Sequence, residues 1–457
     1  MSYDPRAPRK ASFAEARRAF IEGTYRPGDY LDCFLETIIA REGIVRAFAT
    51  LDQSGARAAA AASDARYRAR APLSPMDGLP IAFKDIFEVE GLPTTWGIAE
   101  RGHVAWRDAA IVHALRKGGA VIVGKTTLPE LGFGQPPATT NPWDAERSAG
   151  GSSSGSAAAV GAGFIPAAIG TQGKGSLTRP ASFCGAYAFK PGHGTIHRGG
   201  DGGGQETNTH VGVLAHRLED AWEVARYLSE NPGPHPGHRG LGESMAPPAP
   251  QIPKTLVRMT RAGWPATDEA ARKAFDEICA GLARIGVMIE EAEDVAPVAA
   301  LAAGLDQAAH ALDVISDYES RWPLLMYLEA EKSAPTGAYS SRVVERGLAR
   351  DKWSRAEYED ALAFRDDWRT KLAACRTDGR FIVTPSATGA APQGTNDTGS
   401  SVYQWGSSLA GNPVASLPLM AINSLPLGLE LQGFIGEDAA LMAAARALDE
   451  AFAAGRF

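Results

Sequence analysis

The segment from residue 132 to residue 210 constrains the fold of this chain more than any other part of the sequence. It is very rich in glycine, serine, threonine and proline, a composition that is also typical of flexible linkers. It nevertheless contains apolar runs at 157–160, 164–165 and 181–189, and these side chains need burial that a linker does not provide. We therefore expect a folded segment with closely approached backbone around a site, because glycine leaves space and accepts positive φ angles.

Helical and strand patterns alternate on both sides of this segment. Apolar residues recur at helical spacing within residues 1–70, where Ser12 can cap the first helix. Short apolar runs at 81–83 and 120–124 are typical of buried strands, and a helical pattern at 108–117 lies between them. The alternation predicts an α/β fold in which helices pack on a central sheet.

Strand patterns also lie on both sides of a long helical stretch at 296–375, so we expect an insert that covers one face of a common sheet. One domain is therefore expected over 1–457. Its parts are the N-terminal helices at 1–70, a core with the chemical motifs at 72–230, the helical insert at 296–375, which shapes the pocket, and the C-terminal part of the core at 376–457.

The composition argues against several classes of function. The net charge is −7 and no dense run of lysine and arginine occurs, which argues against nucleic acid as a partner. No apolar stretch approaches roughly 18–20 residues and none follows the polar residues 1–12, so we expect neither a membrane span nor a signal peptide. The wide spacing of the cysteines gives no metal signature and favours free thiols in a reducing, cytoplasmic compartment. These cysteines are Cys33, Cys184, Cys279 and Cys375.

A lysine directly follows the apolar strand pattern at 81–83. One interpretation of Lys84 is a charge at a strand end that reaches solvent, and its residue type alone favours this because buried lysine is rare. The other interpretation is a desolvated lysine, which loses its charge more readily and can act as a neutral base near pH 7.

Glycine and serine dominate a second motif, at 150–156, which leads into an alanine-rich helical pattern. Serine is a good helix N-cap, which is one explanation of the run. Gly151, Ser153 and Gly155 also match the G-x-S-x-G nucleophile elbow, but residues 146–150 lack the apolar strand that such an elbow follows.

The third motif is a glycine-rich loop at 170–180. Consecutive backbone N–H groups in such a loop can form an oxyanion hole, whereas the alternative is a tight surface turn. A phosphate loop is not expected, because Gly175 directly follows Lys174 and Ala168 occupies the position of the first required glycine.

Taken together and in this order, the three motifs resemble the amidase signature family, which includes bacterial amidases such as aryl-acylamidases and urethanase-like enzymes. The family pattern is Gly-x-Pro-x-x-x-Lys-Asp, then Gly-Gly-Ser-Ser-Gly-Gly-Ser, then a Gly-Gly-Ser loop followed by Arg and Pro. The resemblance spans roughly residues 10–455 and implies a single α/β/α domain with a mixed central sheet covered by helices. Further segments that look like the family are 141–144, 183–185, 190–191, 411–413, 425–428 and 436–438.

The resemblance implies a Ser-cisSer-Lys triad. Its matching positions are Ser176 as nucleophile, Ser152 as proton relay and Lys84 as base, and the separation of 24 positions between the serines selects Ser152 over Ser153. Ser153 is then expected to support the turn. The oxyanion would face the backbone N–H groups of Gly173, Lys174, Gly175 and Ser176.

Several positions in the motifs depart from the family pattern, among them Gly173, Ser154 and Thr178, which stands where the family's arginine is usual. Lys174 stands where glycine is usual, and we expect its side chain to point outward, because an unpaired buried charge is costly. Gln172 is a substrate or structural candidate, and Arg179 lies one position later than the family's arginine. For Arg179 a structural ion pair is favoured over binding a substrate carboxylate. A glycine-rich loop at 197–204 is expected near the site.

The implied function is hydrolysis of a C–N acyl bond through an acyl-enzyme, without metal or cofactor. A small hydrophobic aryl amide or carbamate is the expected substrate and partner, and a homodimer is left open. Alternatives are an amidotransferase subunit that works on misacylated tRNA, a Ser-His-Asp esterase, and a non-catalytic binding protein on the same fold. Trp322, Trp353, Trp368 and Tyr327 are candidates for an aromatic wall of the pocket, and the sequence favours a core role for these rings equally.

Overall fold

One mixed sheet of 11 strands forms the centre of the molecule, in the order β1-β5-β2-β6-β8-β7-β12-β13-β11-β9-β10. The computed structural model describes residues 2–7, 11–200, 203–242, 244–333, 337, 339–349 and 351–457. The strands of the sheet are β1 (Phe48–Leu51), β2 (Pro80–Lys84), β5 (Val121–Thr126), β6 (Ala167–Gln172), β7 (Tyr187–Lys190), β8 (His210–Ala215), β9 (Thr255–Arg258), β10 (Met288–Glu291), β11 (Arg380–Pro385), β12 (Val414–Ile422) and β13 (Leu425–Gln432). Two short strands, β3 (Pro93–Thr94) and β4 (His103–Val104), pair separately.

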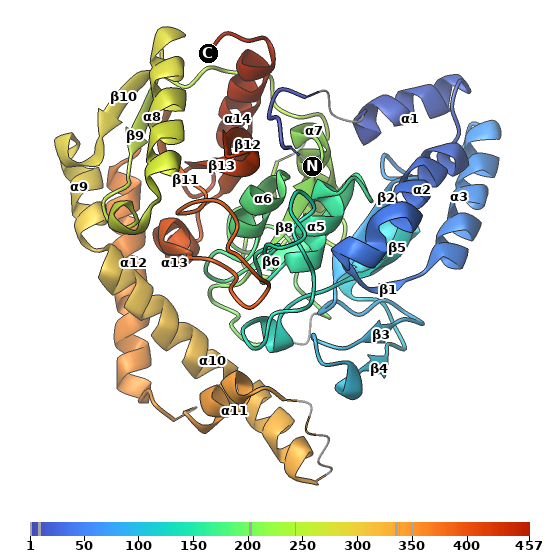
Figure 1. Ribbon diagram of the computed structural model, residues 1–457, viewed down its shortest axis with the longest axis horizontal. Helices are drawn as coiled ribbons and strands as arrows, with labels where there is room; N and C mark the ends of the chain where they lie inside the picture. Colours follow the sequence, from blue (N-terminus) through green and yellow to red (C-terminus); the bar gives the residue numbers. More distant parts are fainter. Residues whose placement is uncertain are drawn as a thin grey trace.

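Helices cover both faces of the sheet, which confirms the predicted α/β/α domain (Figure 1). The helices are α1 (Phe13–Glu22), α2 (Pro27–Val45), α3 (Gln53–Arg68), α4 (Ala110–Lys117), α5 (Ser154–Gly161), α6 (Thr178–Cys184), α7 (Leu218–Glu230), α8 (Glu269–Arg284), α9 (Ala296–Ala303), α10 (Leu305–Ser333), α11 (Ser341–Leu348), α12 (Arg355–Ala374), α13 (Trp405–Ala410) and α14 (Asp438–Ala453).

The alternation of side chains along β2 explains why this strand is apolar throughout. Ile81 and Phe83 belong to a core cluster shared with α1, α4 and α7, whereas Ala82 belongs to a cluster shared with α3 and α5. Successive side chains of a strand point to opposite faces, so a strand covered on both sides has no solvent-facing position. Its neighbours β5 and β6 run parallel to it, which brings the carboxyl ends of the three strands to one edge.

The N-terminal helices follow the predicted pattern with one interruption. Ser12 accepts a hydrogen bond from the Glu15 N–H at 3.1 Å, and the Glu15 side chain accepts one from the Ser12 N–H, which completes a capping box. Between α2 and α3 the chain forms β1, which pairs antiparallel with β5 at the sheet edge. The helical prediction over 1–70 is therefore wrong at this short strand, because edge pairing overrides local helical propensity.

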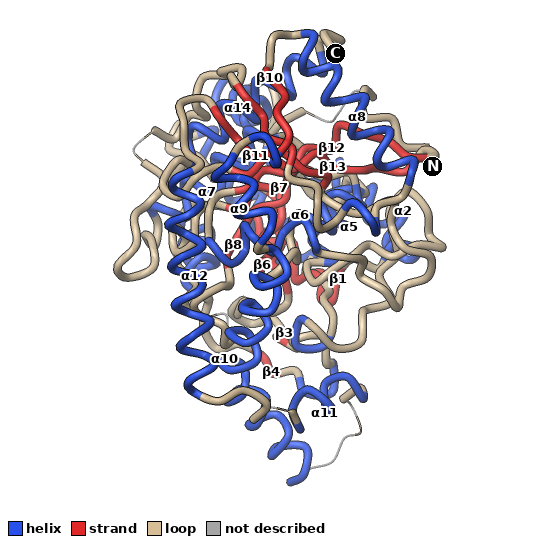
Figure 2. The backbone as a smooth tube through the Cα atoms, turned by 90° about the vertical axis from the view of Figure 1, so that its left-hand side faces the viewer, coloured by secondary structure: helices blue, strands red, loops and turns tan. Residues whose placement is uncertain are grey.

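The insert, α9 to α12, begins and ends close to the predicted bounds of 296–375. Its core cluster includes Val257 of β9 and Ile382 of β11, so the insert packs at that end of the sheet. From there α10 runs alongside α12, and α10 and α11 extend beyond the sheet (Figures 1 and 2). Among the described residues, no single helix could cross a membrane, although α9 and the first part of α10 pass the same test together across a 52° bend. Residues 201 and 202 of the predicted glycine-rich loop lie outside the described residues.

Candidate active site

Lys84 lies at the carboxyl end of β2 and is buried, with 2% of its surface exposed. Its Nζ donates a hydrogen bond to Ser152 Oγ at 2.6 Å and another to Thr171 Oγ1 at 3.0 Å. The interpretation of Lys84 as a charge that reaches solvent is therefore wrong. This strand end is covered by the flanking strands β5 and β6 and by α5, the helix that follows Ser152. The local sequence could not indicate that these elements would bury the lysine.

The structure separates the two neighbouring serines that local sequence could not distinguish. Ser152 follows a cis peptide bond and directs its hydroxyl to Lys84. The Ser153 hydroxyl instead binds the backbone of Thr171, accepting from its N–H and donating to its carbonyl, both at 3.2 Å. Ser153 thus joins the start of α5 to β6, in agreement with its expected supporting role.

Ser176 lies in the loop between β6 and α6 and is partly exposed. Its backbone carbonyl accepts a hydrogen bond from the Ser153 N–H at 3.0 Å, so this loop is fastened to the serine motif. Ser176, Ser152 and Lys84 all line one cavity of about 400 Å³. Three residues separated widely in sequence therefore meet in one site.

Gln172 supports the nucleophile loop, defined here as residues 173–177, from inside the protein. The side chain is fully buried, and its Oε1 accepts the N–H groups of Leu177 and Thr178, both at 3.1 Å. Its Nε2 donates to Ser408 Oγ at 3.2 Å, and Ser408 in turn donates to the Lys174 carbonyl at 2.7 Å. Gln172 is not among the residues that line the cavity, so its contacts are structural.

Lys174 lines the cavity, and its ammonium group forms an ion pair with Asp313 of α10. Its side chain is 34% exposed, so it is neither fully solvated nor buried without a partner. The expectation of an outward, solvated Lys174 is corrected here, because the helical insert brings a carboxylate over the loop. This contact links α10 to the nucleophile loop.

Arg179 holds backbone carbonyls next to Ser152. Its Nη2 donates to the Gly151 carbonyl at 2.6 Å and its Nη1 donates to the Gly399 carbonyl at 2.5 Å. Burial lowers the pKa of Arg179 to about 10. These contacts of Arg179 are hydrogen bonds to carbonyls and not the predicted ion pair, and the residue also lines the cavity.

The cavity has an aromatic and aliphatic wall that differs from the predicted one. Of the four aromatic candidates, only Tyr327 lines the cavity. Trp322 is 64% exposed, and Trp368 is 3% exposed in the core of the insert. Trp353 donates a hydrogen bond to Asp317 and is not among the lining residues. The other apolar lining residues come from the segment after β2, from 128–133 and, in the case of Leu324, from α10 of the insert. The apolar lining consists of Ile86, Trp96, Leu128, Leu131, Phe133, Leu324 and Tyr327.

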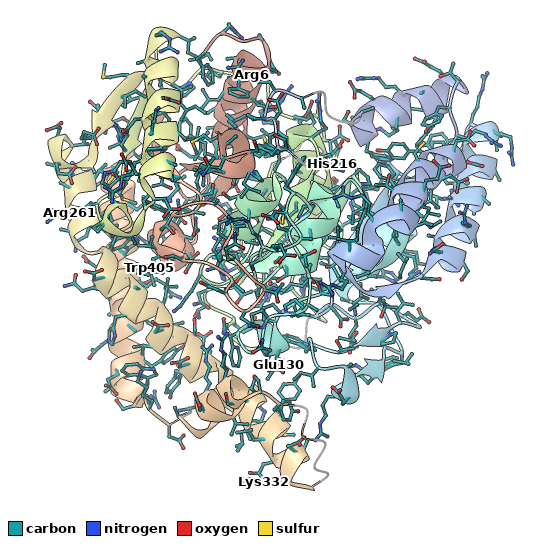
Figure 3. All side chains as sticks on the ribbon, in the orientation of Figure 1. Arg6, Glu130, His216, Arg261, Lys332 and Trp405 are labelled. Carbon is teal, nitrogen blue, oxygen red and sulfur yellow. The ribbon has the colours of Figure 1, made fainter. Side chains whose placement is uncertain are left out.

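Glu130 connects the 128–133 segment to the insert, at the lower centre of Figure 3. Its carboxylate accepts hydrogen bonds from the N–H and the hydroxyl of Ser340, the residue before α11. The Arg346 guanidinium of α11 lies 4.2 Å over the Phe133 ring. Contacts between the core and the insert therefore close this side of the cavity.

Each charged side chain that lines the cavity has a partner within the described part of the chain. Arg346 Nε donates to Asp317 Oδ1 at 2.9 Å, and Arg198 donates to the Gln205 carbonyl at 3.2 Å. With the contacts described above, this accounts for the charged lining, which consists of Lys84, Lys174, Arg179, Arg198, Asp313, Asp317 and Arg346. Lys174 and Arg346 are thus paired with carboxylates of α10, whereas Arg179 binds neutral carbonyl acceptors.

The histidines lie elsewhere. Within the described residues, no histidine lines the cavity. His193, His210 and His238 gather behind the nucleophile loop, and His210 Nδ1 lies 3.0 Å from the Gln172 carbonyl. Burial holds the pKa of His210 well below its usual range. In the same described residues, no group of three or more His, Cys, Asp and Glu side chains could hold a metal ion.

Comparison with known proteins places this geometry in a family. The family model described as Amidase matches residues 29–442. A glutamyl-tRNA(Gln) amidotransferase subunit from Anaeromyxobacter dehalogenans (strain 2CP-C) is 31% identical over 479 positions, covering 92% of this chain and 92% of that protein. The corresponding subunit from Roseiflexus sp. (strain RS-1) is 37% identical over 225 residues, 48% of this chain and 46% of the relative.

In other matches with such subunits, including the one from Roseiflexus sp. (strain RS-1), the chain spans less than half of the relative's length. A crystal structure of an amidase superposes with a TM-score of 0.82 at 26% identity, covering 96% of this chain and 99% of that one. The family model spans most of the sequence and the structural match spans nearly all of it. The chain therefore belongs to the amidase signature family.

Proposed function

We propose that the protein hydrolyses a neutral aryl amide or aryl carbamate through Ser176, Ser152 and Lys84. The observation that carries this proposal is the 2.6 Å hydrogen bond from the buried Lys84 Nζ to Ser152 Oγ, in the cavity that Ser176 also lines. A serine hydroxyl is a poor nucleophile until a base takes its proton. Burial disfavours an ammonium ion, so Lys84 can serve as that base in its neutral form.

In the proposed reaction, Lys84 Nζ takes a proton from Ser152 Oγ as Ser152 takes one from Ser176. Ser176 Oγ then attacks the carbonyl carbon, and the backbone N–H groups of 173–176 stabilise the oxyanion. Collapse of the tetrahedral intermediate breaks the C–N bond, and the proton returns through Ser152 to the leaving nitrogen. Water hydrolyses the acyl-enzyme along the same path, which regenerates Ser176 and releases the acid.

Two features of the cavity support a neutral aryl substrate. Its cationic lining groups already have acceptors, either carboxylates or backbone carbonyls, so a substrate carboxylate would have to compete with them. The rings of Trp96, Phe133 and Tyr327 lie in the lining and offer surfaces on which an aryl group can stack.

A kinetic panel of anilides, aryl carbamates and small carboxylate-bearing amides tests the proposal. The purified chain should prefer the neutral aryl substrates, and Ser176→Ala and Lys84→Ala should each lower kcat by a factor on the order of 10⁴–10⁶. Lys117→Ala, an exposed lysine at the end of α4, should leave kcat unchanged. Preference for the charged amides would overturn the substrate class, and an active Lys84→Ala variant would overturn the triad.

The aromatic wall has its own matched control. Tyr327→Ala and Trp96→Ala should raise KM for an anilide several-fold, because a ring-stacking contact is worth about 0.5–1.5 kcal/mol. Trp322 lies on the same helix as Tyr327 but is 64% exposed, so Trp322→Ala should leave KM unchanged. Equal effects of all three substitutions would show that the rings act on the fold and not on the substrate.

A second candidate function is that of an amidotransferase component working on misacylated tRNA. The alignment with a glutamyl-tRNA(Gln) amidotransferase subunit over 92% of both chains favours it. Such a component needs partner proteins and an ammonia source. Anilide or carbamate hydrolysis by the purified chain alone would argue against this function, whereas glutamine hydrolysis that appears only with added partner proteins would support it.

A further inference from the structure

Glu430 is a fully buried carboxyl group in β13, behind the nucleophile loop. Its Oε2 accepts a hydrogen bond from Gln404 Nε2 at 2.7 Å, and its Oε1 accepts one from Gln432 Nε2 at 3.1 Å. The Thr178 hydroxyl also hydrogen-bonds to it. Its direct partners are thus neutral donors, and burial raises the pKa of Glu430 to about 7. Holding a carboxyl group here costs free energy that a neutral side chain would avoid.

Two of these partners support the loop that carries Ser176. Thr178 is the first residue of α6, and both its N–H and its hydroxyl face Gln172 Oε1, at 3.1 and 3.3 Å. The Gln404 carboxamide packs against Gly175, where a Cβ would lie 3.0 Å from Gln404 Oε1. Glu430 therefore touches the loop's supports on two sides without lining the cavity itself.

We infer that Glu430 is a positioning residue for the nucleophile loop, fixing Thr178 and Gln404 so that the backbone N–H groups of 173–176 face the reacting carbonyl. This inference rests on the proposed function, since it assigns the loop to the oxyanion. A carboxylate suits the position because each of its two oxygens accepts from one carboxamide, that of Gln404 or Gln432, and the Thr178 hydroxyl, which donates to Gln172, lies beside it. A carboxamide in its place has one oxygen, so one of the surrounding donors loses its acceptor.

The physical consequence is a loss of transition-state stabilisation without a loss of substrate binding. The loop's N–H groups act on the oxyanion, which is absent from the ground state. Displacement of such groups by about 1 Å can cost on the order of 100-fold in rate. Glu430 does not line the cavity, and the apolar lining comes from other segments, so we expect substrate affinity to be little affected.

The test compares Glu430→Gln, Thr178→Val and the double variant on the best anilide or carbamate of the panel. Glu430→Gln is expected to lower kcat by about 10- to 100-fold, with KM within about twofold of the parent. Because Glu430 acts partly through Thr178, the fold-decrease in kcat of the double variant should be smaller than the product of the fold-decreases of the two single variants. Asp220→Asn, another buried carboxyl that lies far from the loop in contact with α1, is the matched control and should leave kcat unchanged.

Three outcomes would overturn the inference: an unchanged kcat in Glu430→Gln, a loss confined to KM, or fully multiplicative losses in the double variant. If Glu430→Gln does not fold, Thr178→Val decides alone, and an unchanged kcat there overturns the inference. Ser176→Ala distinguishes this failure from a failure of the proposed function. If activity survives in Ser176→Ala, Ser176 is not the nucleophile and the proposed function fails. If activity is lost in Ser176→Ala but kept in Glu430→Gln, only the positioning role of Glu430 fails.

Discussion

The buried ion pair next to the candidate base should be the most sensitive electrostatic element of the core. Asp85 directly follows Lys84, and its Oδ1 lies 2.6 Å from the Nζ of Lys125 in β5, with both side chains fully buried. Lys125 also donates to the Pro93 carbonyl at 3.1 Å and to Thr94 Oγ1 at 2.9 Å. The pair therefore fixes the end of β2 against its neighbouring strand β5 and against β3.

Replacement of Lys125 by Met keeps most of the side-chain volume and removes the charge, which leaves the Asp85 carboxylate buried without a cation. Breaking a buried pair from one side costs about 3–5 kcal/mol. Unfolding entropy of about 2.1 cal/mol/K per residue gives about 1 kcal/mol/K for a chain of 457 residues. The melting temperature should thus fall by about 3–5 °C.

Scanning calorimetry at pH 7 on the wild type and Lys125→Met measures this shift. The control is Lys254→Met, which breaks an ion pair with Asp378 whose side chains are 64% and 83% exposed. Exposed pairs contribute at most about 1 kcal/mol, so the control should shift the melting temperature by no more than about 1 °C. Equal shifts in the two variants would refute the reasoning, because they would mean that burial adds nothing to the cost of the unpaired carboxylate.

Three other predictions concern separate parts of the fold. Arg179→Met should lower kcat by about tenfold or more in the hydrolysis assay, because the Gly151 carbonyl next to Ser152 loses its donor. Burial raises the pKa of the Asp220 carboxyl group to about 7, so the folded state binds the proton of this carboxyl group more tightly than the unfolded chain does. The folding stability that this proton contributes is lost as pH rises from about 4 through 7. The melting temperature of the wild type should accordingly fall relative to that of Asp220→Asn over this range. Ser12→Ala should cost about 1 kcal/mol in denaturant unfolding, because α1 loses its N-cap.

Local sequence was sufficient for the elements whose pattern is short-range. The cap at Ser12, the apolar strand before Lys84 and the helices of the insert were predicted because spacing and capping act within a few residues. The ordered motifs also named as candidates three side chains that the structure places in one cavity. Their catalytic roles remain predictions that the kinetic variants test.

The strands inside the glycine-rich segment could not be predicted. β6 has the sequence AAIGTQ, which contains few β-branched or aromatic residues, yet it is fully buried between β2 and β8. Its strand conformation comes from pairing on both sides and not from intrinsic propensity. The orientations of Lys174 and Arg179 depend likewise on partners more than 100 residues away, Asp313 and Gly399.

The sequence by itself determined which residue types could carry the chemistry and in what order they occur. The tertiary structure decided which of the two serines meets Lys84, which aromatic rings line the cavity, and that Glu430 supports the nucleophile loop. The physical reason is that burial and hydrogen-bond pairing are properties of neighbours in space. In this fold those neighbours come from β2, β6, β13 and the insert, which chain order does not bring together.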